Sequence, residues 1–90
     1  MAIWYKASGE TQEVAPKNGK KFSLEELQGY VGGSIELVPD IMGKRKELVF
    51  CNEEGKLLGL ELNREATLKY APPGDVLVGD VLVCSQKEIR

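Results

Sequence analysis

A capped helix that stops at two glycines is the feature that most constrains the fold of this chain. It lies in FSLEELQGYVGGSIELV, residues 22–38. Ser23 is placed to accept a hydrogen bond at the N-cap, and Glu26 can reach back to the Ser23 amide to complete a capping box. Phe22 and Leu27 flank the cap at the spacing of a hydrophobic staple. The pattern therefore predicts a helix that begins just after Ser23.

One face of the predicted helix is apolar. Leu24, Leu27 and Val31 recur at i, i+3 and i+7, so we expect them to face the core. Gly29 weakens a helix and therefore predicts that a neighbouring segment approaches closely there. The helix should end at Gly32-Gly33, because glycine adopts the left-handed C′ conformation without a steric penalty.

Beyond the double glycine the apolar period changes from helical to alternating. Residues 34–38 predict a strand with Ile35 and Leu37 on the core side, closed by Pro39. Residues 3–7 and 11–14 flank a turn candidate at 8–10 and predict an N-terminal hairpin. Trp4 and Tyr5 point to opposite faces of its first strand, so we expect one in the core and the other in water. Two further strands are predicted at 47–51 and 56–60, joined by a turn at 52–55.

The last third of the chain contains one ambiguous segment and one clear strand. Residues 63–70 fit either a short helix, with Ala66 and Tyr70 on one side, or an irregular excursion. The APPG sequence at 71–74 breaks regular structure, because neither proline can donate to a ladder. The run DVLVGDVLVC at 75–84 predicts one strand before Gly79 and, after it, a central strand covered on both faces.

Together these patterns predict a single α+β domain over residues 1–90. We expect a small, mostly antiparallel sheet of about five to six strands, partly barrel-like, with one short helix packed on it. The charged residues 85–90 are expected to form a frayed tail.

Composition limits the classes of partner. The chain has 12 basic and 14 acidic side chains and a net charge of −2, which provides no general attraction to nucleic acid. No apolar run is long enough to span a bilayer, and the N-terminus lacks a signal-peptide pattern, so we expect a cytoplasmic protein without membrane contact. Cys51 and Cys84 lie in apolar runs and are interpreted as buried reduced thiols, with a single disulfide as the alternative.

Catalytic and metal-binding signatures are absent from the sequence. The chain has no histidine, the residue most used for general acid–base catalysis near neutral pH. The Glu53-Glu54 pair lies in a turn and is interpreted as solvated, and the turn does not match a calcium loop. We therefore expect a protein that is not an enzyme and that requires neither a metal nor another cofactor.

Two groups of residues are candidates for binding. An exposed aromatic side chain at Trp4 or Tyr5 and the basic cluster Lys44, Arg45 and Lys46 would contact a protein partner; ordinary packing and a solvated loop are the alternatives. Binding of DNA or RNA would require that basic cluster to converge with Lys17, Lys20 and Lys21, which the acidic balance disfavours.

A small ligand of nucleotide type is the second possibility. Asn63 and Arg64 offer amide and guanidinium donors, and Tyr70 could stack on a base. The amides of Gly32 and Gly33 could approach an anion. The alternative is that Arg64 pairs with a surface glutamate and that the glycines only cap the helix.

The order of three segments resembles a small family of unknown function, DUF3846. The segments are LQGYVGGSIELV, CNEEGKLLGLELNR and DVLVGDVLV, and the resemblance covers roughly residues 24–83. It is carried by Leu27, Gln28, Val31, Gly32, Gly33, Ile35, Glu36, Cys51, Asn52, Glu53, Gly55, Lys56, Gly59, Leu60, Asn63, Arg64, Gly79 and Val83.

The resemblance implies an origin in a bacterial phage, plasmid or other mobile element, and no established activity. Mobile elements commonly carry small modifiers of host proteins. We therefore expect an accessory protein that binds a host protein, with modulation of a defence system as one role. Exposed edge strands would also allow a homodimer. Sequestration of a nucleotide signal and nucleic-acid binding remain the second and third alternatives.

Overall fold

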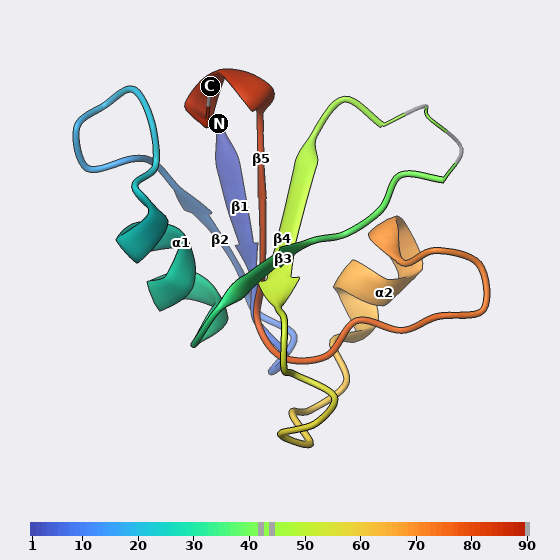
Figure 1. The fold of residues 1–90 in the computed structure, drawn as a ribbon. Coiled ribbons are helices and arrows are strands. Elements are labelled where there is room, and N and C mark those ends of the chain that lie inside the picture. Colours follow the sequence, from blue (N-terminus) through green and yellow to red (C-terminus); the bar gives the residue numbers. More distant parts are fainter. Residues whose placement is uncertain (42, 44, 90) are drawn as a thin grey trace.

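The chain folds into a five-stranded antiparallel sheet with one helix on each face (Figure 1). The computed structural model describes residues 1–41, 43 and 45–89. The strands are β1 (Ala2–Tyr5), β2 (Thr11–Val14), β3 (Ile35–Leu37), β4 (Leu48–Asn52) and β5 (Val81–Cys84). The helices are α1 (Leu24–Val31), α2 (Arg64–Tyr70) and a short 3-10 helix, η1 (Gln86–Glu88). Within these residues, no helix has the length and apolarity that a bilayer span requires.

Strand β5 is the centre of the sheet. The strand order is β2-β1-β5-β4-β3, and Leu82 lies between Trp4 of β1 and Phe50 of β4. All four residues of β5 are buried, which confirms the prediction of a strand covered on both faces. The α+β class with a small antiparallel sheet is confirmed as well, and the sheet is not closed, so it lacks the partly barrel-like form that was also expected.

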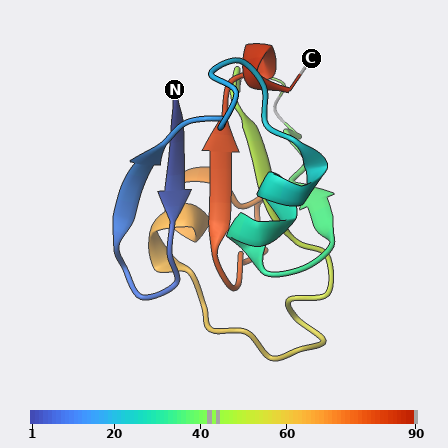
Figure 2. The same cartoon turned by 90° about the vertical axis from the view of Figure 1, so that its left-hand side faces the viewer.

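Each face of the sheet has its own core cluster. On the α2 face Tyr5, Val49, Val81 and Val83 pack with Ala66 of the helix. On the other face α1 packs against β3, β4 and β5, as Figure 2 shows from the α1 side, and its core includes Phe22, Leu27, Val31, Phe50 and Leu82. Alternate residues of the inner strands supply the two clusters, because successive strand side chains point to opposite faces.

The two cysteines lie in different clusters. Cys51 belongs to the α2 face and Cys84 to the α1 face, and both are free and buried. The interpretation as buried reduced thiols is confirmed. Burial raises the pKa of Cys51 to about 11 and that of Cys84 to about 12, with nearby carboxylates adding to each shift.

Helix α1 has the predicted ends. Ser23 Oγ accepts from the Glu26 amide at 3.1 Å, and Glu26 Oε1 accepts from the Ser23 amide at 2.9 Å. Gly32 has φ 80° and its amide donates to the Gln28 carbonyl at 2.8 Å. Leu27 and Val31 are buried, but Leu24 is 58% exposed, so its expected core position is wrong.

The core beside the start of α1 is filled by an aromatic side chain. Phe22 is buried there and meets Tyr30 edge to face, with ring centroids 6.0 Å apart. Phe22 precedes the cap and enters the core from outside the helix, whereas Leu24, the first residue of α1, is exposed. The expected neighbour at Gly29 is also absent, since a Cβ there would have no atom within 4 Å.

Two expectations, for the core position of Leu37 and for a strand at residues 56–60, are wrong. Leu37, which was expected on the core side, is 46% exposed on the edge strand β3, which has a neighbouring strand on one side alone. Residues 56–60 form consecutive turns instead of a strand, and Gly59 has φ 68°. The ambiguous segment 63–70 is helical, which adds a second helix to the expected one.

The C-terminal segment is packed, in contrast to the predicted fraying. Glu88 is buried, and its carbonyl accepts from the Phe22 amide at 2.7 Å. Its carboxylate lies 3.3 Å from the amino group of Met1 and accepts from the Ser85 amide at 2.9 Å. The end of the chain is therefore tied to both the N-terminus and the entry of α1, while Arg90 lies outside the described residues.

Candidate functional site

The residues proposed to bind a nucleotide do not meet. Asn63 is 1% exposed and serves as the N-cap of α2. Its Nδ2 donates to the carbonyls of Tyr5 and Gly79, both at 2.9 Å, and its Oδ1 accepts from the Ala66 amide at 3.1 Å. All of the hydrogen-bonding groups of this side chain that a ligand would need are already used within the core.

The other proposed ligand residues are distributed over separate places. The amides of Gly32 and Gly33 both donate to the Gln28 carbonyl, so they close the helix and do not face an anion. Arg64 is exposed at the start of α2, whereas Tyr70 is half-buried at its end and packs edge to face on Tyr5. This arrangement favours the capping interpretation of the glycines.

The proposed partner-binding aromatics are both packed. Tyr5 is buried on the α2 face, and Trp4 is half-buried on the α1 face. Trp4 Nε1 donates to the Tyr30 carbonyl at 3.1 Å, and the two rings meet edge to face. The expectation that one of the pair is in water is wrong, because a helix covers each face of the sheet.

Arg45 and Lys46 of the second basic cluster lie in different environments. Arg45 is half-buried and donates to the carbonyls of Val38 at 2.6 Å and Tyr70 at 3.3 Å, which fastens the β3–β4 loop to the end of α2. Lys46 is exposed, and Lys44 lies outside the described residues. In Figure 1 the segment that carries Arg45 and Lys46 and the loop that carries Lys17 lie on opposite sides of the sheet, so these described residues do not form one surface.

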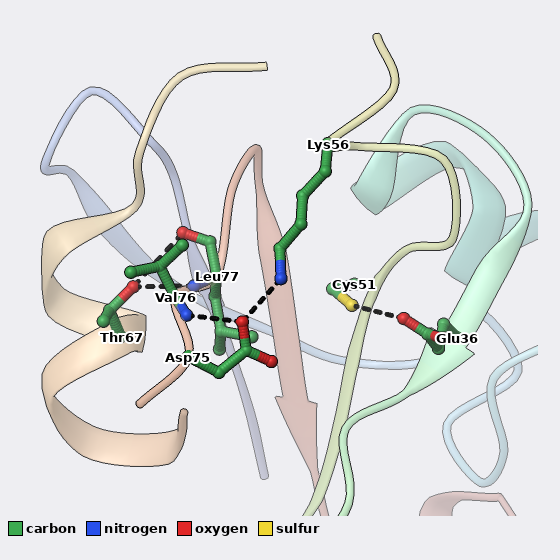
Figure 3. Close-up of polar contacts among 7 residues, drawn as sticks. All are labelled: Glu36, Cys51, Lys56, Thr67, Asp75, Val76 and Leu77. Carbon is green, nitrogen blue, oxygen red and sulfur yellow. Dashed lines mark hydrogen bonds and ion pairs between the residues drawn. The ribbon is translucent and has the colours of Figure 1, made fainter. Parts of the chain in front are cut away.

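A partly enclosed hollow lies between the β3–β4 edge and the segment that follows α2 (Figure 3). Its volume is about 100 Å³. One wall comes from β3 and β4, one from the turn after β4, and one from residues 72–78. The lining residues are Glu36, Val38, Pro39, Cys51, Asn52, Glu53, Lys56, Pro72, Asp75, Val76, Leu77 and Val78. We call this hollow the acidic cavity.

Local hydrogen bonds hold the wall that faces the sheet. Thr67 of α2 accepts from the Leu77 amide at 2.9 Å and donates to the Leu77 carbonyl at 3.2 Å. Asp75 Oδ1 accepts from the Val76 amide at 2.7 Å. A single bridge between Leu62 and Val78 continues the contact. Residues 75–78 are thus fixed against α2 although they form no regular strand.

Two charged contacts lie inside the acidic cavity. Lys56 Nζ lies 2.5 Å from Asp75 Oδ1 and closes the mouth (Figure 3). The hydrogen bond to Asp75 raises the pKa of Lys56, and the same bond lowers the pKa of Asp75. On the opposite wall the Cys51 thiol donates to Glu36 Oε1 at 3.8 Å. The pair Lys56 and Asp75 is therefore ionised near neutral pH, whereas Cys51 keeps its proton.

The thiol in the acidic cavity is held in its neutral form. A thiol is nucleophilic as a thiolate, and burial together with Glu36 holds Cys51 in the neutral form. Among residues 1–41, 43 and 45–89, no group of three or more metal-ligating side chains is close enough to hold an ion. The acidic cavity can instead offer carboxylate acceptors next to apolar walls.

A second hollow lies on the other side of Val76. It is lined by Leu62, Arg64, Glu65, Thr67, Leu68 and Val76, and we call it the apolar hollow. Leu68 is 84% exposed, while Leu62 and Val76 are each 43% exposed. Val76 lines both hollows, so the apolar hollow and the acidic cavity are neighbours on one surface.

No pattern in the sequence predicts this surface. Leu68 lies in the segment that fits either a short helix or an irregular excursion, Glu36 and Lys56 carry only the family resemblance, and no motif marks Asp75. A usable signal existed in α2, where Leu68 lies on the face opposite Ala66 and therefore points away from the core. The remaining residues become neighbours only through the strand order.

Comparison with known proteins identifies one match. The model of a family described as a domain of unknown function, DUF3846, matches residues 2–89. No curated protein and no solved structure matches the chain.

Proposed function

The chain belongs to the DUF3846 family, and from this premise we propose that it is a non-enzymatic accessory protein that acts by binding another protein. The partner is a protein of the bacterial host, and the site of action is the host cytoplasm. The expected origin in a phage or other mobile element, where small modifiers of host proteins are common, supports this assignment.

The apolar hollow is the observation that carries the proposal. Leu62, Leu68 and Val76 expose their side chains around one depression, whose lining also includes the charged residues Arg64 and Glu65. Exposed apolar side chains gathered in one place and surrounded by polar residues are typical of a protein contact. An apolar centre with a charged rim is also the usual anatomy of such an interface.

The chemistry of the titratable groups supports binding without catalysis. Both thiols are protonated near neutral pH because they are buried. Among the described residues, Asn63 has the most buried polar side chain, and that side chain caps α2. The proposed role is therefore the occupation of a surface on the partner, and modulation of a bacterial defence system is one consequence of such occupation.

Capture from bacterial lysate tests the proposal with a matched pair of variants. Leu68→Glu places a charge in the apolar hollow, and Leu24→Glu places the same charge on α1, at a position that is also exposed. Surface substitutions of this kind leave the fold intact. We expect the native chain and Leu24→Glu to capture the same protein and Leu68→Glu to lose it. Capture of nothing, or equal capture by all three chains, would contradict the proposal.

A further inference from the structure

The acidic cavity has the size and charge of a receptor for one basic side chain. Its lining contains three carboxylates, on Glu36, Glu53 and Asp75, and one ammonium, on Lys56. Its apolar walls include Val38 and Leu77, which are buried. An excess of negative charge beside low-dielectric walls attracts a cation more strongly than the same charges do in open water.

The volume of the acidic cavity restricts the ligand. About 100 Å³ corresponds to roughly three water molecules. Cavities that hold whole cofactors or drug-sized ligands are on the order of 300–1,000 Å³. A guanidinium or ammonium group therefore fits here, and a nucleotide does not.

The chain already holds a cation at this place. Lys56 projects from the turn after β4, and its ammonium group lies against Asp75 at the mouth of the cavity (Figure 3). The Lys56 side chain is 60% exposed, so it can leave the cavity without rearrangement of the core. An exposed ion pair of this type contributes little to stability, so replacement of the Lys56 ammonium by another cation requires little free energy.

We propose that the acidic cavity receives an arginine or lysine side chain of the bound protein, and that Lys56 occupies its mouth until that side chain displaces it. The inference rests on the proposed protein-binding function and specifies the partner. Because Val76 separates the two hollows, the partner segment presents an apolar side chain to the apolar hollow and a basic one to the acidic cavity. Charge complementarity selects such a segment over an acidic one.

Small cations test the cavity without the partner. Methylguanidinium reproduces the end of an arginine side chain, and methylurea is its uncharged counterpart of similar shape. Titration of the ¹⁵N-labelled full chain, followed by NMR, should give saturable shifts at the amides of Glu36, Cys51 and Asp75 with methylguanidinium and not with methylurea. Equal shifts with both compounds, or none with either, would overturn the inference.

Variants of the same chain test the displacement of Lys56. Lys56→Met should bind methylguanidinium about threefold more tightly, the size expected for the loss of one competing exposed ion pair. Glu36→Gln should bind it more weakly, and Lys46→Met, at an exposed lysine on another loop, should bind it as the native chain does. Unchanged affinity in Lys56→Met would contradict displacement.

The two proposals fail separately. If Leu68→Glu loses the captured protein but methylguanidinium does not bind the acidic cavity, the inference of a basic side chain is overturned and the protein-binding function stands. If methylguanidinium binds selectively but Leu68→Glu captures the same protein as the native chain, the proposed protein contact at the apolar hollow is contradicted and the affinity of the cavity for a cation stands.

Discussion

Asn63 donates from its side-chain nitrogen to the main-chain carbonyl of Tyr5 at 2.9 Å, across 58 residues of sequence. The same side chain caps α2 and reaches the Gly79 carbonyl, so one buried amide joins the helix, the first strand and the entry to the central strand. The surface proposed to bind a partner begins at this point, because α2 and residues 75–78 are positioned through it.

Replacement of this amide should be among the most destabilising changes in the chain. Asn63→Ala leaves buried partners of three hydrogen bonds unpaired, and we expect a loss of about 3 kcal/mol in the free energy of unfolding, measured with urea. Asn18→Ala is the control, since Asn18 accepts from the Lys20 and Lys21 amides in an exposed loop. A loss in Asn63→Ala no larger than in Asn18→Ala would show that the buried amide is not a structural link.

Substitution of Gly29 and of Gly33 by alanine should change the stability of the fold in opposite directions. A Cβ at Gly29 meets no atom within 4 Å, so Gly29→Ala should stabilise the fold by about 1 kcal/mol through helix propensity. A Cβ at Gly33 would lie 2.9 Å from Asn52 Nδ2, so Gly33→Ala should destabilise it by about 1 kcal/mol or more. Thermal unfolding of the two variants beside the native chain provides the comparison. A shift of the same sign in both would contradict the packing described for these positions.

Stability should fall as the solution becomes alkaline. The folded state raises the pKa of Cys51 to about 11 and that of Cys84 to about 12, from an ordinary value of 9.0. The contribution of the neutral thiols is therefore complete below pH 9 and is lost as the pH rises through the folded pKa values. At pH 10 we expect a loss of about 1 kcal/mol per thiol relative to pH 8.

The double variant Cys51→Ala, Cys84→Ala isolates this effect, because it keeps every other titrating group. Urea unfolding at pH 8 and pH 10 should show a smaller decrease for the double variant than for the native chain. Parallel decreases would indicate that the thiols are not the groups responsible.

Arg45 should stabilise the molecule and Lys46 should not. The guanidinium of Arg45 donates to the carbonyls of Val38 and Tyr70 from two different nitrogens, Nη2 and Nη1. Lysine has a single terminal nitrogen, which does not reproduce this planar, two-nitrogen geometry. Arg45→Lys should therefore cost about 1 kcal/mol and speed hydrogen exchange at the end of α2. Lys46→Ala, at the exposed neighbour, should leave the stability and the hydrogen exchange of α2 unchanged. A similar effect in the two variants would exclude the proposed link between loop and helix.

The parts of the fold that could be predicted depend on short-range signals. The cap at Ser23, the stop at Gly32 and the doubly buried strand at Val81–Cys84 are each encoded within about ten residues. The exposure of Leu24 could not be predicted, because helical periodicity places it on the same face as the buried Leu27 and Val31 and does not indicate how far the core extends along α1. Residues 56–60 are mostly apolar and follow a turn, which favours a hairpin strand, yet Gly59 adopts a positive φ and the chain turns there.

The candidate site could not be predicted for a different reason. Glu36 and Cys51 become neighbours through pairing of β3 with β4, and Asp75 joins them because Thr67 holds Leu77 against α2. No spacing in the sequence indicates these contacts. Asn63 and Gly32, which the sequence suggests as ligand-binding residues, instead cap the ends of helices.

Hydrogen–deuterium exchange of the full chain, alone and bound to the captured partner, tests the central claim most directly. A protein contact on the apolar hollow and acidic cavity predicts slower exchange on binding in residues 62–68 and 75–78, with α1 and β2 unchanged. Protection confined to α1, β2 or the loop between them would contradict the proposed binding surface.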